Sequence, residues 1–401
     1  MLNQDRWLLP EGIEEVFPDE AARLEDLGRR VIDLFGCWGY RLVMPPLIDF
    51  LDSLLVGSGH ELDFQTFKFT DPASGRLIGL RADMTPQVAR IDARTARTNL
   101  PTRFCYTGSV LHTLSGHLEK TRNPLQVGAE LFGHGGHAAA IEVIRLMLEM
   151  LDIAGIGDIH LDLGHVGIYR ALARQAGMTA ETEAGLFEIL QRKDPADLDS
   201  YLMAAEVPAT VGEMLAALLD LNGPVSVLAE ARQRLIAGGE FMTLALAELS
   251  AIADNLHQHY PDLPIHFDLA ELRGYHYHTG VVFAAFVPGQ GREIARGGRY
   301  DDIGKVFGHA RPAVGFSADL KTLARLVDDP AKARPAQSAI FAPAVADAEL
   351  DDAIRALRAK GEVVIQALGG LSESAIGLNC GFELRKSNDQ WQVVNLTVHA
   401  E

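Results

Sequence analysis

The order in which strand-like and helix-like segments follow one another is the feature that most constrains the fold of this chain. Strand-like runs come in adjacent pairs instead of being separated by helices. The pairs are predicted at Phe64–Phe69 with Leu77–Leu80 and at Phe104–Leu111 with Gln126–Phe132. Helices are predicted over residues 84–98 and 137–153. Hairpins that alternate with helices indicate an α+β fold with an antiparallel sheet, because parallel strands need a crossover connection.

The chain is long enough for more than one domain, since it has 401 residues. Residues 168–258 are rich in Ala, Leu and Glu at helical spacing and predict a helical insertion. Strands resume after it and close a first domain over residues 1–327. A polar linker that contains prolines, residues 328–338, then precedes a βαβ pattern and a hairpin. These patterns predict a small C-terminal α/β domain over residues 339–401.

Composition limits the classes of partner and the compartment. The 36 basic and 54 acidic residues give a net charge of −18, which repels a polyanion such as nucleic acid. No apolar run approaches the roughly 18 residues of a membrane helix, and we expect no membrane association. The N-terminus lacks the pattern of a secretory signal. Cys37, Cys105 and Cys380 are widely spaced and fit free thiols in a reducing cytoplasm.

Four polar residues are candidates for ligand contacts. Asp83 and Thr85 open a predicted helix, where the simplest reading is that they cap its first backbone N–H groups. Asp83 could equally receive an ammonium group. Gln126 and Glu130 are four residues apart on a predicted strand and share one of its faces. That face is either exposed to solvent or buried with its acid paired, because a buried unpaired carboxylate is costly.

The segment ELRGYHYHTGVVF concentrates a cation, aromatic rings and imidazoles around a glycine. Arg273 could hold a carboxylate through paired hydrogen bonds. If the segment is extended, Tyr275 and Tyr277 point to one face while His276 and His278 point to the other.

A metal site is the alternative reading of the histidine pairs in HYH, HTLSGH and GHGGH. No spacing matches a known set of zinc ligands and no cysteine lies nearby, so we expect no metal. The chain also lacks both the GxGxxG and the P-loop fingerprints of nucleotide binding, and we expect no cofactor. The paired glycines of RGGRYD, residues 296–301, allow either a close backbone approach or a tight turn.

Five ordered segments resemble the catalytic core of the histidyl-tRNA synthetases. They are GYRLVMPPLIDF, LRADMTPQVAR, QVGAELFG, LRGYHYHTGVVF and GGRYD. The resemblance covers the first domain. It implies a class II aminoacyl-tRNA synthetase-like antiparallel sheet flanked by helices, and a dimer that forms through the first of these segments.

The same resemblance assigns the candidate residues to two sites. It implies that Asp83, Thr85, Gln126, Glu130, Arg273 and Tyr277 bind histidine, although Asp83 replaces a family glutamate and His278 a family tyrosine. His112 stands where the family has the arginine that holds the ATP α-phosphate, and Leu114 where it has a glutamate. Thr322 stands at the position of a second ATP-binding arginine. Without these charges the stabilisation needed for adenylate formation is lost, so we expect no catalytic residues.

A histidine pocket without ATP-binding arginines resembles the ATP phosphoribosyltransferase regulatory subunits, which are paralogues of the synthetases. That family implies a hetero-oligomer with a short-form catalytic subunit at the first step of histidine biosynthesis, activation of that subunit, and feedback inhibition by histidine. The short C-terminal segment and the acidic charge argue against tRNA binding.

Two other classes of function stay open. One is an ATP-dependent ligase that uses other cations, for example Arg122, Arg296 or Arg299. The other is a free-standing histidine-binding module.

Overall fold

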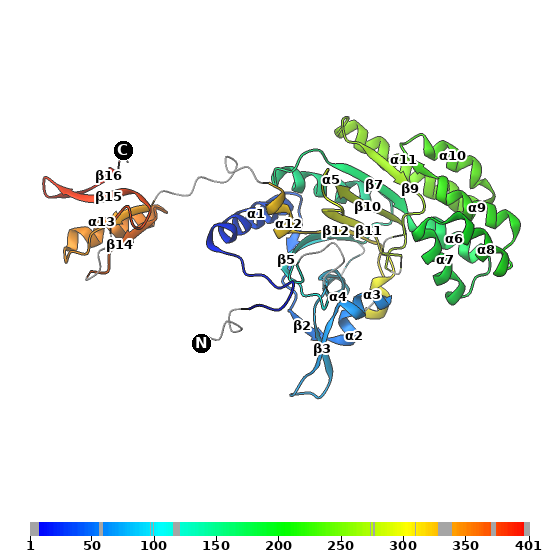
Figure 1. The fold of residues 1–401 in the computed structure, drawn as a ribbon, viewed down its shortest axis with the longest axis horizontal. Helices are drawn as coiled ribbons and strands as arrows, with labels where there is room; N and C mark the ends of the chain where they lie inside the picture. The colour runs from blue at the N-terminus through cyan, green and yellow to red at the C-terminus, as the bar shows by residue number, and fades with distance from the viewer. Residues whose placement is uncertain are drawn as a thin grey trace. The chain divides into compact units, whose positions relative to one another are not determined.

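The computed structural model describes residues 8–55, 59–96, 98, 100–114, 121–272, 274–275, 277–308, 310–327, 339–369 and 374–396. Two compact units make up the chain, Met1–Asp328 and Asp329–Glu401, and each is described here by itself. Figure 1 shows the elements of both units. The predicted linker, residues 328–338, lies outside the described residues.

In the described part of the first unit, the main sheet has nine strands. Their order across the sheet is β1 (Arg41–Leu42), β5 (Thr102–Ser109), β6 (Leu125–Phe132), β12 (Ala313–Asp319), β11 (Ala295–Arg299), β10 (Val281–Phe286), β7 (His160–His165), β9 (Ile265–Asp268) and β8 (Asn222–Gly223). The strands from β5 to β7 are antiparallel to their neighbours. Among the described strands of this sheet, only the outer pairs β1 with β5 and β7 with β9 are parallel. The predicted α+β class is therefore confirmed.

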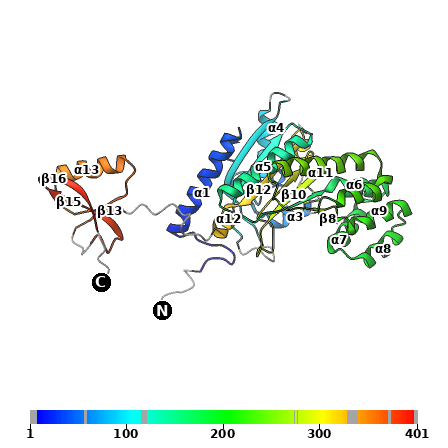
Figure 2. The same ribbon diagram turned by 90° about the horizontal axis from the view of Figure 1, so that it is seen from above.

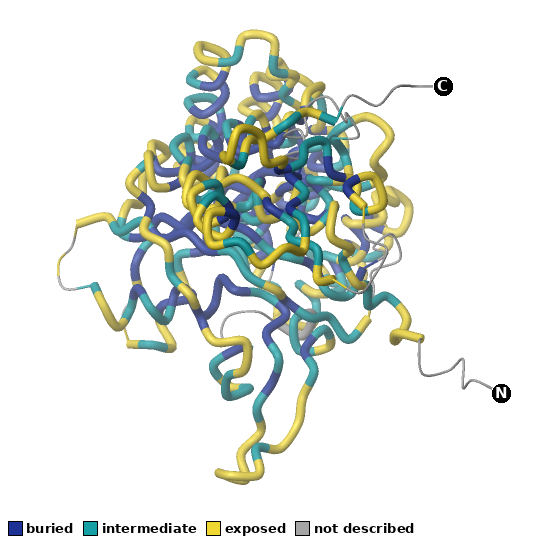
Figure 3. The backbone as a smooth tube through the Cα atoms, turned by 90° about the vertical axis from the view of Figure 1, so that its left-hand side faces the viewer, coloured by how far each residue is buried: buried dark blue, intermediate teal, exposed yellow. Residues whose placement is uncertain are grey.

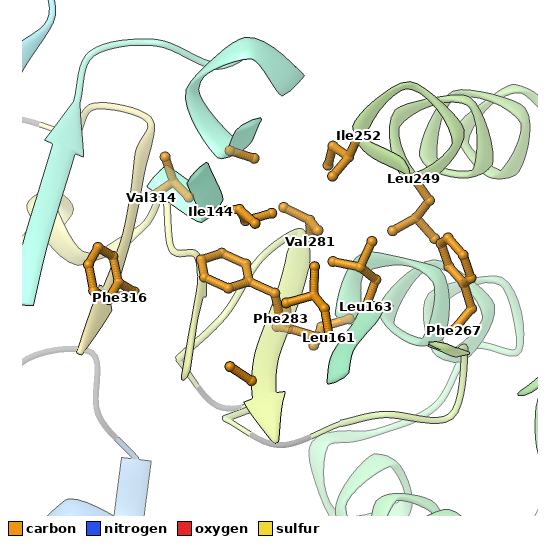
Figure 4. Packing of buried hydrophobic residues seen from close by; sticks show 14 of the residues in the cluster. Ile144, Leu161, Leu163, Leu249, Ile252, Phe267, Val281, Phe283, Val314 and Phe316 are labelled. Atoms are coloured by element: carbon orange, nitrogen blue, oxygen red, sulfur yellow. The ribbon is translucent and has the colours of Figure 1, made fainter. Parts of the chain in front are cut away.

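One face of this sheet carries the large hydrophobic core. Helices α1 (Pro18–Cys37), α5 (His137–Ile153), α11 (Glu240–His259) and α12 (Leu320–Leu326) contribute to it (Figure 2). Figure 4 shows Val281 and Phe283 of β10 packed near Ile144 of α5 and Leu161 of β7. On β6, alternation sends Val127, Ala129 and Leu131 into this core and leaves the even-numbered residues on the opposite face.

The opposite face is covered by helix α4 (Thr85–Thr95) and the 3-10 helix η3 (Ile303–Phe307), which pack with Phe104 and Phe132. Beside it lies a smaller sheet of β2 (Ile48–Phe50), β4 (Leu77–Leu80) and β3 (Phe67–Thr70), with helices α2 (Leu51–Leu54) and α3 (Gly59–Gln65). The tip of the predicted β3–β4 hairpin projects into solvent (Figure 3). Phe64 lies in α3 and not in the predicted strand, because that helix continues to Gln65 and the strand begins only at Phe67.

Helices fill the chain between β7 and β9. They are α6 (Val166–Gln175), α7 (Ala180–Arg192), α8 (Pro195–Ala204), α9 (Ala209–Asp220), α10 (Val227–Arg234), the 3-10 helix η2 (Ile236–Gly238) and α11. Pro195 starts α8, where its missing N–H costs nothing, and Asp194 caps the same helix end. Pro208 precedes α9 in the same way. The two prolines therefore mark where α8 and α9 begin.

The second unit is a small α/β fold. Its sheet has the order β14 (Val364–Gln366), β13 (Ala339–Ala342), β15 (Cys380–Ser387) and β16 (Gln390–Asn395), with helix α13 (Ala348–Ala359) on one face. Strands β13 and β14 are parallel and β15 and β16 form the predicted hairpin. The Asp347 carboxylate caps α13 and accepts hydrogen bonds from Lys386 and Trp391, so one side chain joins the helix to the hairpin.

No helix among the described residues is long and apolar enough to cross a membrane.

A buried ion pair holds α4 against the strands that carry the site. The Arg311 guanidinium donates to both carboxylate oxygens of Asp92, at 3.0 and 3.1 Å, and to the Thr102 hydroxyl at 3.2 Å. Both partners are buried. Gly133 leaves room for it, because a Cβ there would lie 2.2 Å from the Arg311 Nη2 atom.

We predict that Arg311→Met lowers the free energy of unfolding by about 3–5 kcal/mol, because it leaves the Asp92 charge buried and unpaired. Urea unfolding followed by circular dichroism measures the change. Arg355→Met is the matched control, since the Arg355–Asp352 pair is exposed and its loss costs about 0.5 kcal/mol or less. Equal losses in the two variants would contradict the prediction.

Candidate functional site

The site is built around the buried carboxyl group of Glu130, which is only 1% exposed. Its Oε1 atom accepts hydrogen bonds from the hydroxyl groups of Thr85, at 3.1 Å, and Tyr106, at 3.0 Å. The Tyr300 hydroxyl donates to its Oε2 atom. The donors come from α4, from β5 and from the end of β11, so the group joins three elements of the sheet face. An exposed strand face, one reading of the sequence, is thereby excluded.

Glycines make the space for this network. Gly315 of β12 is the register partner of Glu130, and a Cβ there would lie 1.5 Å from the carboxyl Oε2 atom. Gly128 of β6 is equally constrained, since its Cβ would lie 2.4 Å from the Tyr106 hydroxyl. Larger residues at either position would displace the groups of the site.

The paired glycines Gly297 and Gly298 lie within strand β11 and not in a turn. A Cβ on Gly297 would lie 2.2 Å from the Gly315 carbonyl oxygen, which explains the need for glycine in a strand here. Strand β11 therefore continues through both glycines to Arg299 and delivers Tyr300 to the site.

Burial sets the protonation of the central acid. Loss of hydration raises the pKa of Glu130 to about 8, and the nearby charge of Asp83 acts in the same direction. The hydrogen bonds from Tyr300, Tyr106 and Thr85 oppose these effects. Near neutral pH the group is therefore mostly a neutral acid. It can accept hydrogen bonds, and it can also pass its proton to a basic ligand.

Asp83 and Gln126 form a second polar group next to Glu130. The Gln126 amide donates to the Asp83 carboxylate at 2.8 Å and accepts from the Met84 backbone N–H at 3.0 Å. The same Asp83 oxygen accepts from the Thr85 backbone N–H at 3.1 Å and lies 3.2 Å from the Thr85 hydroxyl, whose one proton is shared between Asp83 and Glu130. Asp83 thus both stabilises the start of α4 and takes part in the polar cluster, so the two readings of the sequence are compatible.

Tyr277 covers the network from the side. Its ring stacks on Tyr300, with centroids 4.9 Å apart and planes at 29°. Its hydroxyl oxygen is buried and makes no hydrogen bond to any residue that the structure describes. Burial, together with the charges of Glu130 and Asp83, raises the pKa of this phenol well above its ordinary value. Of the predicted site residues, Arg273 lies outside the described residues, and the other five converge.

The segment that carries Tyr277 is a turn and not an extended strand, which corrects the sequence-based expectation. The backbone N–H groups of Tyr277 and His278 both donate to the Gly274 carbonyl at 2.8 Å. Gly274 has φ +69°, a conformation that favours glycine. Tyr275 and Tyr277 therefore leave the turn in different directions, and Tyr275 stacks on Phe187 of α7. His276 lies outside the described residues.

Of the three positions that the resemblance compares with ATP-binding residues, His112 and Thr322 contact other protein groups and Leu114 is exposed. A ring nitrogen of His112 lies 3.0 Å from the Ala82 carbonyl oxygen, in hydrogen-bonding distance. Leu114 is 70% exposed. The Thr322 hydroxyl donates to the Asp319 carboxylate at 2.8 Å, at the start of α12.

The cations that an ATP-dependent ligase would use are also engaged by the protein. Arg122 donates to the carbonyl oxygens of His112 and Glu11, both at 3.0 Å. Arg299 donates to the carbonyls of His134 and Gly136, and Arg296 pairs with Glu293. These contacts hold loops and the N-terminal segment together. They disfavour the ligase alternative.

Sequence reasoning missed Tyr106 and Tyr300. Tyr106 shares a strand face with Phe104, and Tyr300 follows the paired glycines, but neither pattern shows that a hydroxyl reaches Glu130. The signal lies in the sheet order, which places β5 beside β6 and β12 between β6 and β11. Among the described residues, no group of three or more His, Cys, Asp or Glu side chains could hold a metal ion.

Fold and site together define a protein of the histidyl-tRNA synthetase type. The family model described as histidyl-tRNA synthetase matches residues 12–323, and the model described as ATP phosphoribosyltransferase subunit HisZ C-terminal domain matches residues 337–394. A solved histidyl-tRNA synthetase from a Nostoc species shares the fold, with a TM-score of 0.74 at 18% identity over 97% of each chain.

Proteins with higher sequence identity indicate which family within this class the chain resembles. A solved Bacillus halodurans protein described as an ATP phosphoribosyltransferase regulatory subunit/histidyl-tRNA synthetase has a TM-score of 0.79 at 26% identity, covering 93% of this chain and 96% of that chain. The curated ATP phosphoribosyltransferase regulatory subunit of Methylococcus capsulatus is 58% identical over 97% of this chain and 96% of its own length. That of Thioalkalivibrio sulfidiphilus is 55% identical over 99% of this chain and 100% of its own.

The chain therefore belongs to the family of ATP phosphoribosyltransferase regulatory subunits. The resemblance inferred from the sequence is confirmed. As a member of this family, the chain is a regulatory subunit and not the catalytic one.

We predict that Glu130→Gln changes the pH dependence of stability. The folded-state pKa of Glu130 lies above its ordinary value of 4.5, so the folded protein binds the extra proton and wild-type stability falls as pH rises from about 5 to about 8. Glutamine mimics the neutral acid and removes this dependence. The variant should match the wild type at pH 5 and exceed it at pH 8.5, by a margin on the order of a few kcal/mol.

Urea unfolding at the two pH values measures the effect. Glu188→Gln, on the exposed side of α7, is the control and should leave the pH dependence unchanged. A Glu130→Gln variant that is destabilised equally at both pH values would show that the carboxylate is the stable form in the folded protein.

Proposed function

We propose that this chain assembles with a short-form ATP phosphoribosyltransferase catalytic subunit, activates it, and takes part in its feedback inhibition by histidine, at the first step of histidine biosynthesis. The observation that carries the proposal is the contrast between two sites of one scaffold. The polar groups around Glu130 are assembled and buried. The positions that would hold ATP are occupied by His112, Leu114 and Thr322, none of which supplies a fixed positive charge.

Histidine is the ligand that the polar groups suit. The neutral Glu130 carboxyl and the unpartnered Tyr277 hydroxyl can bind the two ring nitrogens of an imidazole. Asp83 and Gln126, with Thr85, offer acceptors for an ammonium group. Arg273 supplies a charge for the ligand carboxylate.

Regulation requires that ligand and partner act on one equilibrium. This subunit activates its partner only if the active state of the catalytic subunit contacts it more favourably than the inactive state. Histidine inhibits only if it binds more tightly to the assembly in which the catalytic subunit is in its inactive state.

The rate of phosphoribosyl-ATP formation by the short catalytic subunit of the same organism tests the proposal. We expect a large rate increase when this chain is added, and suppression of that increase by L-histidine. ATP–pyrophosphate exchange by this chain alone should remain at background. No activation and no association with the catalytic subunit would refute the proposal, and histidine-dependent exchange would favour the ligase alternative.

The histidine site is tested by calorimetric titration of the isolated chain with L-histidine. We expect Glu130→Ala and Arg273→Ala each to weaken binding by about 10- to 100-fold, because a hydrogen bond that involves a charged group contributes about 1.5–3 kcal/mol. Glu188→Ala and Arg296→Ala are matched controls at exposed positions. Unchanged affinity in both site variants would show that histidine binds elsewhere. If Glu130→Ala does not fold, Arg273→Ala still tests the site.

We also propose that the chain forms a dimer through the segment around β1. Apolar side chains gather there on the sheet edge: Leu42, Met44, Leu47 and Ile48 are 42%, 81%, 45% and 46% exposed. Exposed apolar groups of this kind are typical of subunit interfaces.

Met44→Asp should convert the dimer into a monomer, because it places a charge in the apolar contact. Light scattering coupled to size-exclusion chromatography measures the mass. Met203→Asp is the control, since Met203 is 82% exposed on the insertion. A Met44→Asp variant that remains dimeric would exclude this interface.

The proposal further places the chain in the cytoplasm and without a role in tRNA binding. The net charge of −18 opposes binding of a polyanion. Cys37, Cys105 and Cys380 are free thiols, which fits a reducing compartment.

A further inference from the structure

The turn at Gly274 sends two tyrosines to two different parts of the first unit. Tyr277 stacks on Tyr300, and the Tyr300 hydroxyl binds Glu130. Tyr275 packs instead against helices of the insertion. One residue separates them, and both backbone hydrogen bonds that close the turn end on the Gly274 carbonyl. The ligand site and the insertion are therefore joined through a single short segment.

The insertion holds Tyr275 from several sides. The ring stacks on Phe187 of α7, with centroids 5.1 Å apart and planes at 30°. It also meets the edge of Tyr169 of α6 at 5.2 Å. The Tyr275 hydroxyl donates to the Glu183 carboxylate, and the Arg170 guanidinium donates to the Tyr275 carbonyl oxygen.

These contacts leave Tyr275 only 8% exposed and fixed to the insertion. Rotation of Tyr275 would break a stacked contact and a hydrogen bond to a charged group. The turn requires glycine at position 274, because φ is positive there and an added Cβ would lie 2.5 Å from the His278 ring.

We propose that Tyr275 is a positioning residue that couples ligand occupancy at the Glu130 site to helix α7 of the insertion. The unpartnered Tyr277 hydroxyl binds the ligand. The hydrogen bond between Tyr275 and Glu183 then passes the resulting displacement to α7. This inference rests on the proposed function, since it takes L-histidine as the ligand. It adds a route by which that site communicates with a distant surface.

Coupling of this kind is reciprocal. If histidine stabilises the contact between the turn and α7, then the loss of that contact must weaken histidine binding by the same factor. Tyr275→Phe removes the donor of the hydroxyl–carboxylate hydrogen bond and keeps the ring, and Glu183→Ala removes its acceptor and keeps a residue that favours the helix. A double-mutant cycle on histidine affinity should therefore show that the two effects are not additive.

Hydrogen exchange measured by mass spectrometry tests the inference on the full chain, with and without saturating L-histidine. In the wild type we expect histidine to slow exchange across residues 180–192 by about fivefold or more, the lower end of usual coupling strengths. In Tyr275→Phe we expect this protection to fall below about twofold, because the coupling is lost. Histidine should also bind this variant more weakly. Tyr201→Phe is the matched control, because its hydroxyl bonds the Thr182 carbonyl on the same helix at 2.9 Å without contacting the turn.

The outcomes separate this inference from the proposed function. If the wild type binds histidine but exchange in α7 does not change, the coupling is refuted and the binding site stands. If Tyr275→Phe keeps the full protection, or if Tyr201→Phe loses it equally, Tyr275 is not the positioning residue. If the wild type does not bind histidine at all, the binding-site proposal fails and this inference fails with it.

Discussion

The burial of one carboxyl group, that of Glu130, is the constraint on which the rest of the site depends. A buried acid is stable only if its oxygens are hydrogen-bonded, and the donors here come from residues 85, 106 and 300, which are far apart in sequence. The group also needs a glycine directly across the sheet, at Gly315. The register of β6 against β12 and the position of α4 are thus fixed by the same few atoms.

Beside this polar centre, the chain has His112 and Thr322 at positions that the resemblance compares with ATP-binding arginines. His112 and Thr322 contact neighbouring protein groups, and Arg122 ties the N-terminal segment to the end of β5. A guanidinium that is occupied by backbone carbonyls is not available to a phosphate without losing those bonds. Membership of a regulatory family agrees with these contacts, because neither His112 nor Thr322 supplies a fixed positive charge.

The helical insertion is connected to the site by more than the peptide chain. Its helices α6 and α7 hold Tyr275, and the turn at Gly274 carries the contact on to Tyr277 and Tyr300. Packed aromatic rings of this kind can carry the proposed coupling, since packed interiors respond by discrete rearrangement. The burial of the phenols, which raises the pKa of Tyr106 and of Tyr300 well above the ordinary value, keeps them as neutral donors in this path.

The sequence by itself determined the elements and one face of the site. The period of two along β6 places Gln126 and Glu130 together, and the prolines at 195 and 208 separate the helices of the insertion. Only the tertiary structure decided which hydroxyl groups reach Glu130, because Tyr106 and Tyr300 meet it through a sheet order that local patterns do not encode. It also decided that the Tyr275–Tyr277 segment turns, since the left-handed φ of Gly274 and the packing of Tyr275 against α7 outweigh the strand-like alternation of the sequence.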